Sequence, residues 1–235
     1  MIRLSNLTRV IPGIILVLSL IIPAIFLASC QQAVNTDFDG SRAFADVEYQ
    51  ASLGARVPGS QAHIQVQEYI QSELKDAGWS AEIQQAQMMG HPISNIVGKK
   101  REGKPWIILG AHYDSRLIAD KDPDPANRTL PIPGANDGAS GVAILLELAR
   151  TLPDLDMEIW LVFFDAEDNG NIPGWDWILG SNAFVQQLTR APEVVVILDM
   201  LGDEDLNIHY ERNSDPVLSA QIWQKAAELG YEEYF

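Results

Sequence analysis

Long apolar runs separated by amphipathic segments give this chain the pattern of an α/β protein. Residues 106–111, 159–164 and 194–198 are continuous apolar runs, each typical of a strand buried within a sheet. Two further strands are expected at 80–87 and 95–98. Helical spacing is found at 61–77, 142–151, 182–188 and 216–229. This alternation predicts an α/β three-layer sandwich with a mixed, mainly parallel, twisted central sheet flanked by helices.

The first 30 residues differ from the rest of the chain. Arg3 and Arg9 precede an almost wholly apolar run at 11–27, and small residues then lead into Cys30. This order resembles a bacterial lipoprotein signal peptide, whose cysteine becomes the lipidated first residue, and an uncleaved signal anchor is the alternative. Cys30 is the only cysteine in the chain and cannot form an internal disulfide. Either alternative places the protein outside the cytoplasm and attached to a membrane.

Composition and charge limit which domain organisation and which classes of binding partner are possible. Residues 31–43 are polar and aperiodic, as expected for a flexible tether, and residues 44–235 are expected to form one domain. The chain has 32 acidic and 16 basic residues, a net charge of −16. Nucleic-acid binding and basic membrane-surface patches both need clustered cations, so this balance argues against them. The acidity is typical of solubility outside the cytoplasm, although some carboxylates remain to be explained by a site.

Four short stretches combine a strand end or a helix start with metal-ligating or acid–base side chains. They are GAHYDS at 110–115, PGANDGASG at 133–141, FFDAED at 163–168 and ILDMLGD at 197–203. In α/β enzymes, polar groups gather at the carboxyl ends of the strands. One histidine with several carboxylates in such positions is typical of a zinc site. The sequence therefore indicates a metallohydrolase or a relative of one.

The first two stretches also have ordinary structural explanations. His112 follows a buried strand, and Asp114 is placed to hold the second nitrogen of its ring. The pair is equally compatible with a metal ligand or with a packed histidine at a strand end. Asp137 lies in a glycine-rich loop before a helix, where it is either a metal ligand or the N-cap of that helix.

The other two stretches place carboxylates next to apolar strands. Glu167 and Asp168 end an acidic run that begins at Asp165, and adjacent side chains diverge, so one can bind a metal while the other carries protons. A solvated acidic loop is the alternative. Asp199 interrupts an apolar run, where a charge is expensive unless it is paired. Either a metal ion or the partner in a buried ion pair would offset the charge of Asp199.

The order of GAHYDS, GANDGASGVA, FFDAED, LGS (179–181) and VVVILDMLGD resembles family twenty-eight of the metallopeptidases. That family holds zinc aminopeptidases and glutaminyl-peptide cyclotransferases, and the resemblance extends from about residue 44 to the last residue. It implies a mixed, twisted sheet of about eight strands between helices. It also implies a zinc-peptidase-like catalytic domain over 44–235, with one or two zinc ions as cofactor.

The resemblance assigns roles to individual residues. In the two-zinc aminopeptidases, it implies that His112 and Asp168 are ligands, that Asp137 bridges the metals, and that Asp199 binds the second metal. Glu167 is then the general base. In the single-zinc cyclotransferases, the positions of Asp137 and Asp168 hold the zinc, while Glu167 and Asp199 handle protons. The candidate catalytic carboxylates are Glu167, Asp114 and Asp199, and the candidate metal ligands are His112, Asp137, Asp168 and Asp199.

Two departures from the family pattern affect the expected site. Asp168 stands where the family usually has a longer glutamate. The family's final ligand is a histidine well downstream of Asp199, but the only downstream histidine here is His209. It lies in an expected strand at 207–213 and is too near to be taken as that ligand. We therefore expect the C-terminal part of the domain to be missing, so that this fragment by itself is metal-poor and inactive.

Three functions are compatible with these residues. The first is an aminopeptidase-type metallopeptidase that cleaves N-terminal peptide bonds with zinc-bound water and Glu167 as base. The second is a glutaminyl-peptide cyclotransferase that forms N-terminal pyroglutamate and releases ammonia; the insert NGNIPGWDW favours it if Trp175 or Trp177 walls a substrate pocket rather than packing in the fold. The third is a non-catalytic ectodomain. Peptide or protein N-termini are the expected substrates of the first two.

Overall fold

The computed structural model describes residues 37–235. The predicted signal segment, Cys30 and residues 31–36 of the predicted tether lie outside the described residues. Within residues 37–235, no helix combines the length and the apolar character that crossing a membrane requires.

The described residues form one mixed sheet of five strands in the order β1-β2-β4-β3-β5. The strands are β1 (Ser80–Met88), β2 (His91–Lys99), β3 (Trp106–His112), β4 (Glu158–Phe164) and β5 (Val194–Ile197). The pairings of β2 with β1 and β4 are antiparallel, whereas those of β3 with β4 and β5 are parallel. The mixed sheet is confirmed, and its parallel part is the half formed by β4, β3 and β5.

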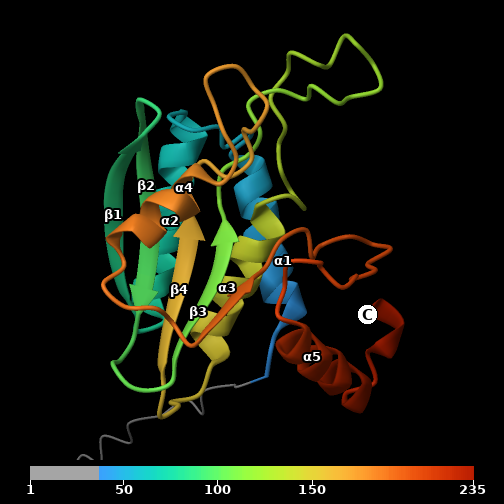
Figure 1. The fold of residues 1–235 in the computed structure, drawn as a ribbon. Helices are drawn as coiled ribbons and strands as arrows, with labels where there is room; N and C mark the ends of the chain where they lie inside the picture. Colours follow the sequence, from blue (N-terminus) through green and yellow to red (C-terminus); the bar gives the residue numbers. More distant parts are fainter. Residues whose placement is uncertain (1–36) are drawn as a thin grey trace, which may run out of the picture. The chain divides into compact units, whose positions relative to one another are not determined.

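Helices cover both faces of this sheet. The helices of residues 37–235 are α1 (Gly40–Ser52), α2 (Gln61–Asp76), α3 (Ala139–Thr151), α4 (Leu179–Gln187) and α5 (Pro216–Glu228), followed by the short 3-10 helix η1 (Glu232–Tyr234). Figure 1 shows α1, α2 and α3 on one face and α4 on the other, which is the three-layer arrangement that the sequence predicts.

Alternating side chains along the central strands explain the two hydrophobic layers. In β4, Leu161 and Phe163 join the core under α2 and α3, whereas Val162 and Phe164 face α4 with Phe184. Successive side chains of a strand point to opposite faces, so a continuous apolar run is needed when both faces are covered. The runs in β3 and β4 are therefore explained by burial on both sides.

Four expectations differ from the structure. Residues 40–43, assigned to the tether, form the first turn of α1, where the Asp39 side chain accepts bonds from two backbone N–H groups. The final strand β5 is at the sheet edge and its Val195 and Ile197 are exposed, so the prediction that it is buried is wrong. Residues 207–213 form no strand. The sheet of residues 37–235 has five strands rather than about eight.

The carboxyl ends of β3 and β4 meet at one edge of the sheet. Because these strands are parallel and in register, His112 at the end of β3 lies beside Phe164 at the end of β4. Figure 1 shows the loops that follow both strands extending beyond their arrowheads. This edge is where the polar stretches of the sequence come together.

Candidate metal centre

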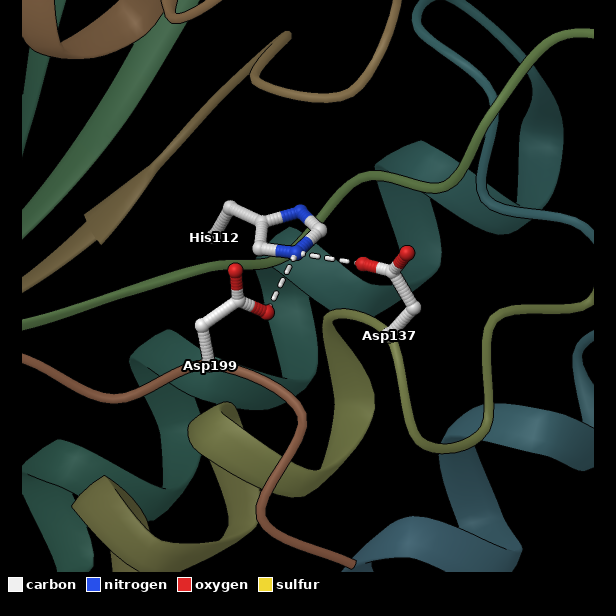
Figure 2. Close-up of side chains that lie close together, drawn as sticks. All are labelled: His112, Asp137 and Asp199. Atoms are coloured by element: carbon white, nitrogen blue, oxygen red, sulfur yellow. Dashed lines mark ion pairs between the residues drawn. The ribbon is translucent and has the colours of Figure 1, made fainter. Parts of the chain in front are cut away.

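Three side chains from separate segments converge at this edge. His112 is the last residue of β3, Asp137 lies in the loop before α3, and Asp199 follows β5. One potential ligand atom from each lies within 4.8 Å of the other two. Figure 2 shows both carboxylates turned toward Nε2 of the His112 ring. The structure thus brings together three of the four predicted metal ligands.

The Nε2 atom of His112 is a buried polar atom without a hydrogen bond. It lies 2.9 Å from an oxygen of Asp137 and 3.6 Å from an oxygen of Asp199, but neither oxygen is in hydrogen-bonding geometry. Buried polar atoms nearly always have a partner. One imidazole nitrogen and two carboxylate oxygens that surround a common point are a donor set suited to zinc, and three protein ligands with an open position are typical of catalytic zinc.

The other ring nitrogen is held by Asp114, as the sequence predicts for a metal-binding imidazole. Nδ1 of His112 lies 3.3 Å from Oδ1 of Asp114, which is fully buried. Asp114 also accepts hydrogen bonds from the backbone N–H of Glu167 at 2.9 Å and from the side chain of Asn169 at 3.3 Å. The carboxylate therefore connects the end of β3 to the loop after β4 and holds the His112 ring in position.

Electrostatics couple these groups strongly. Burial lowers the pKa of His112, but the carboxylates of Asp114, Asp137 and Asp199 outweigh burial and raise it well above its usual value. The pKa of Asp199 is lowered mainly by His112. The surrounding carboxylates therefore favour a proton on His112. Because zinc binds neutral imidazole, it competes with this proton.

Glu167 lies next to the cluster without joining it. Burial, together with the negative charges of Asp114, Asp168 and Asp199, raises its pKa to about 7, although His112 lowers it. A carboxylate whose pKa lies near neutrality is suited to accept and return a proton at physiological pH. This environment agrees with the role of general base that the resemblance implies.

Asp168 is the predicted ligand that remains outside the three-residue cluster. Its side chain accepts a hydrogen bond from Arg116 at 3.3 Å, and Arg116 also donates to the Asp168 backbone carbonyl at 2.8 Å. Burial and the charge of Asp137 raise the pKa of Asp168 to about 6, although Arg116 lowers it. Sequence reasoning missed Arg116, and the available signal was its position directly after GAHYDS.

The backbone around the cluster is constrained at several points. Gly138, with φ +91°, is the N-cap residue of α3, so the alternative that Asp137 caps this helix is wrong. A Cβ on Gly138 would lie 3.1 Å from Cε1 of His112, so only glycine allows the loop to approach the ring. Ala166 precedes Glu167 and Met200 follows Asp199, and both have left-handed φ values, 48° and 51°. Strained residues of this kind cluster at functional sites.

The reason for the position of Asp199 differs from the one that the sequence suggests. It lies beyond the end of β5, and its side chain is 49% exposed. The argument that a buried apolar run forces a partner on this charge is therefore wrong. Its position beside His112 results instead from the register of β5 against β3.

The remaining predicted residues occupy distinct places. The Trp175 ring stacks on His91 with centroids 3.7 Å apart. This tryptophan therefore packs in the fold, which is the alternative to forming the wall of a substrate pocket. The Trp177 ring is 40% exposed and lies 5.2 Å from the guanidinium of Arg116, beside Asp168. His209 is exposed and is not part of the cluster.

Comparison with known proteins identifies the family. The model of peptidase family M28 matches residues 93–234. The chain belongs to this family. A Zn-dependent exopeptidase from Parabacteroides distasonis is 33% identical with a TM-score of 0.79, and the match covers 86% of this chain and 76% of that one. A glutaminyl cyclase from Tannerella forsythia is 36% identical with a TM-score of 0.78, over 84% of this chain and 75% of that one. Members with both activities are thus similar to this M28 chain.

The curated relatives are longer proteins than this chain. Glutaminyl-peptide cyclotransferase from Bothrops jararaca is 27% identical over 217 residues, which cover 77% of this chain and 57% of that protein. The chain spans about half the length of the curated relatives it matches. Family membership and fold are therefore shown, and the reaction of the whole protein is a proposal.

Proposed function

We propose that this M28 protein is a zinc-dependent aminopeptidase-type metallopeptidase that hydrolyses N-terminal peptide bonds. The observation that carries the proposal is the convergence of His112, Asp137 and Asp199 around a buried nitrogen without a hydrogen bond, with Glu167 beside them. The residues present fit zinc, and His112, Asp137 and Asp199 would hold it. Bound zinc polarises a carbonyl and lowers the pKa of water toward about 7.

The side chains of the protein supply the proton transfers and the positioning. Glu167 is poised to take a proton from the attacking water and to deliver it to the leaving amine, because its pKa of about 7 allows both states at neutral pH. Asp114 holds the His112 ring and the Glu167 backbone together, so base and ligand keep a fixed relation. Such acid–base catalysis contributes about 10²- to 10⁴-fold to the rate.

Cyclisation of N-terminal glutamine is the second candidate. It is supported by the similarity to glutaminyl cyclases and by the half-exposed Trp177 beside Arg116 and Asp168, an aromatic surface suited to a small side chain. In this reaction Glu167 would take a proton from the substrate α-amine. That amine attacks the γ-carboxamide carbon, the new C–N bond closes the ring, and ammonia leaves with the transferred proton.

One experiment separates the candidates. The longest available form of the protein, incubated with zinc, is given two peptides that differ only in an N-terminal glutamine or leucine. The products are identified by mass spectrometry. Loss of the first residue from the leucine peptide supports the peptidase. Loss of ammonia alone from the glutamine peptide supports the cyclase and rejects the first proposal.

The matched control is Glu167→Gln, which removes the base and leaves the size of the side chain unchanged. If neither peptide changes with the longest available wild-type form while zinc binds, the non-catalytic alternative replaces both candidates. We also propose a location outside the cytoplasm, supported by the charge and apolar pattern of residues 1–30.

A further inference from the structure

Arg56, in the connection between α1 and α2, is fully buried, an unusual environment for an arginine. All hydrogen bonds that its guanidinium makes within residues 37–235 go to backbone carbonyl oxygens. A buried charge without a bonded carboxylate is costly, so its position requires a local explanation.

The three acceptors belong to two of the three segments that carry the metal-binding side chains. Nε of Arg56 donates to the carbonyl of Tyr113 at 3.1 Å, next to His112 and Asp114. The two terminal nitrogens donate to the carbonyls of Pro133 and Gly134, each at 2.7 Å. The planar fork thus joins the end of β3 to the loop that leads to Asp137.

Close packing leaves these segments little freedom around the guanidinium. The backbone carbonyl of Arg56 accepts a hydrogen bond from the N–H of Ser115, so both its side chain and its main chain hold this segment. A Cβ on Gly134 would come within 3.0 Å of Nη2 of Arg56 and 2.7 Å of the Asp137 carbonyl oxygen. Close contacts on several sides therefore restrict the position of the Asp137 loop relative to β3.

Charge and geometry act on metal binding in opposite directions. Burial lowers the pKa of Arg56 to about 10, although Asp114 and Asp137 raise it, so the side chain stays protonated at neutral pH. A nearby cation repels a metal ion, so its charge alone would weaken binding. Any favourable effect of Arg56 must come from the order that its hydrogen bonds impose.

We propose that Arg56 is a positioning residue that fixes the Asp137 loop against the end of β3 and so preorganises the metal centre. Without this fork, metal binding would have to order the loop and would lose affinity. The inference rests on the metal centre of the proposed function but not on the choice between peptidase and cyclase.

The test separates the charge from the fork. Arg56→Lys keeps the charge but loses the planar set of donors, whereas Arg56→Met loses both. Metal-free preparations of the longest available form of the protein are titrated with Zn²⁺ by calorimetry, and visible absorption spectra are recorded with Co²⁺. We expect both variants to bind Zn²⁺ about 10- to 100-fold more weakly, as for other groups that support metal ligands. We also expect both to show altered Co²⁺ bands.

Arg150→Lys is the matched control, because Arg150 binds carboxylates that belong to α1, α2 and α3 and has no contact with the cluster. It should lower the thermal midpoint while leaving Zn²⁺ affinity within about twofold. Wild-type affinity and Co²⁺ spectrum in folded Arg56→Lys would overturn the proposal. Failure of the wild-type chain to bind Zn²⁺ would instead overturn the metal centre itself.

Discussion

Two clusters of charged side chains in this molecule differ in whether their members are bonded to one another. The helix ion network joins α1, α2 and α3 and consists of Arg42, Asp46, Glu73, Glu147 and Arg150. Its carboxylates are paired with arginines at 2.6 to 3.3 Å. The metal centre has two carboxylates around a ring nitrogen that makes no hydrogen bond.

The contrast is visible in the most buried member of each cluster. Glu147 receives two hydrogen bonds from Arg42, one from Arg150 and one from the Asp39 backbone, and Arg42 is the main group that lowers its pKa against the effect of burial. His112 instead has carboxylate oxygens around Nε2 that it does not bond. A cluster whose carboxylates are all paired with arginines contributes to the fold by itself. Carboxylates gathered around a nitrogen without a hydrogen bond are instead suited to receive a cation.

Replacing the base beside the metal centre should have the largest effect on catalysis. Glu167→Gln should lower kcat by about 10²- to 10⁴-fold, equivalent to about 3–5 kcal/mol, because the amide cannot accept the proton. Zn²⁺ affinity and the unfolding midpoint should change little. Steady-state kinetics and calorimetry on the same preparation check this, and near-normal turnover would remove Glu167 from its role.

The helix ion network should respond in the opposite manner. Glu147→Gln should lower the free energy of unfolding by about 3 kcal/mol, because Arg42 and Arg150 then lose a buried partner. Zn²⁺ affinity should remain at the wild-type value. Urea denaturation measures the stability, and a loss of metal binding without a loss of stability would contradict the separation of the two clusters.

The pH dependence of activity gives a smaller effect at the metal centre. Glu167 acts as a base only when deprotonated, so kcat/KM should fall about tenfold for each pH unit below its pKa. Burial and neighbouring carboxylates raise that pKa to about 7, and a bound cation would lower it, so the acid limb should lie at or below pH 7. A profile that stays flat between about pH 5 and 8 would show that another group limits the reaction.

The smallest expected effect comes from the exposed side of the helix ion network. The Arg42 side chain is 41% exposed, and Glu147 keeps Arg150 and the Asp39 N–H when Arg42 is lost. Arg42→Ala should therefore cost less than about 1 kcal/mol of unfolding free energy. Thermal denaturation beside Glu147→Gln measures the difference, and equal losses would mean that the two partners are energetically equivalent.

Local patterns predicted most elements because those elements are apolar where they are buried. The central strands follow from continuous apolar runs with two covered faces, and α2 and α3 follow from helical spacing. Helix α1 was missed because its buried positions are Ala43, Asp46 and Gln50, two of which are polar. Its inner face is held by ion pairs and hydrogen bonds that only the folded chain supplies.

The candidate site was predictable in part for a similar reason. His112, Asp137 and Asp199 stand in short motifs at strand and loop ends, so the sequence locates them. Arg56 and Arg116 act through backbone carbonyls of distant segments, and nothing in their local sequence says which arginine becomes buried. The exposure of β5 likewise depends on the order of strands rather than on its own apolar run.

The left-handed backbone at Ala166 and Met200 has a consequence for engineering this protein. Glycine adopts such φ values without steric cost, and strain at a non-glycine residue costs about 1–3 kcal/mol. Selection for thermostability would therefore favour glycine at both positions. The same change would release the backbone that directs Glu167 and Asp199, so variants chosen for heat resistance alone should lose activity at these two positions.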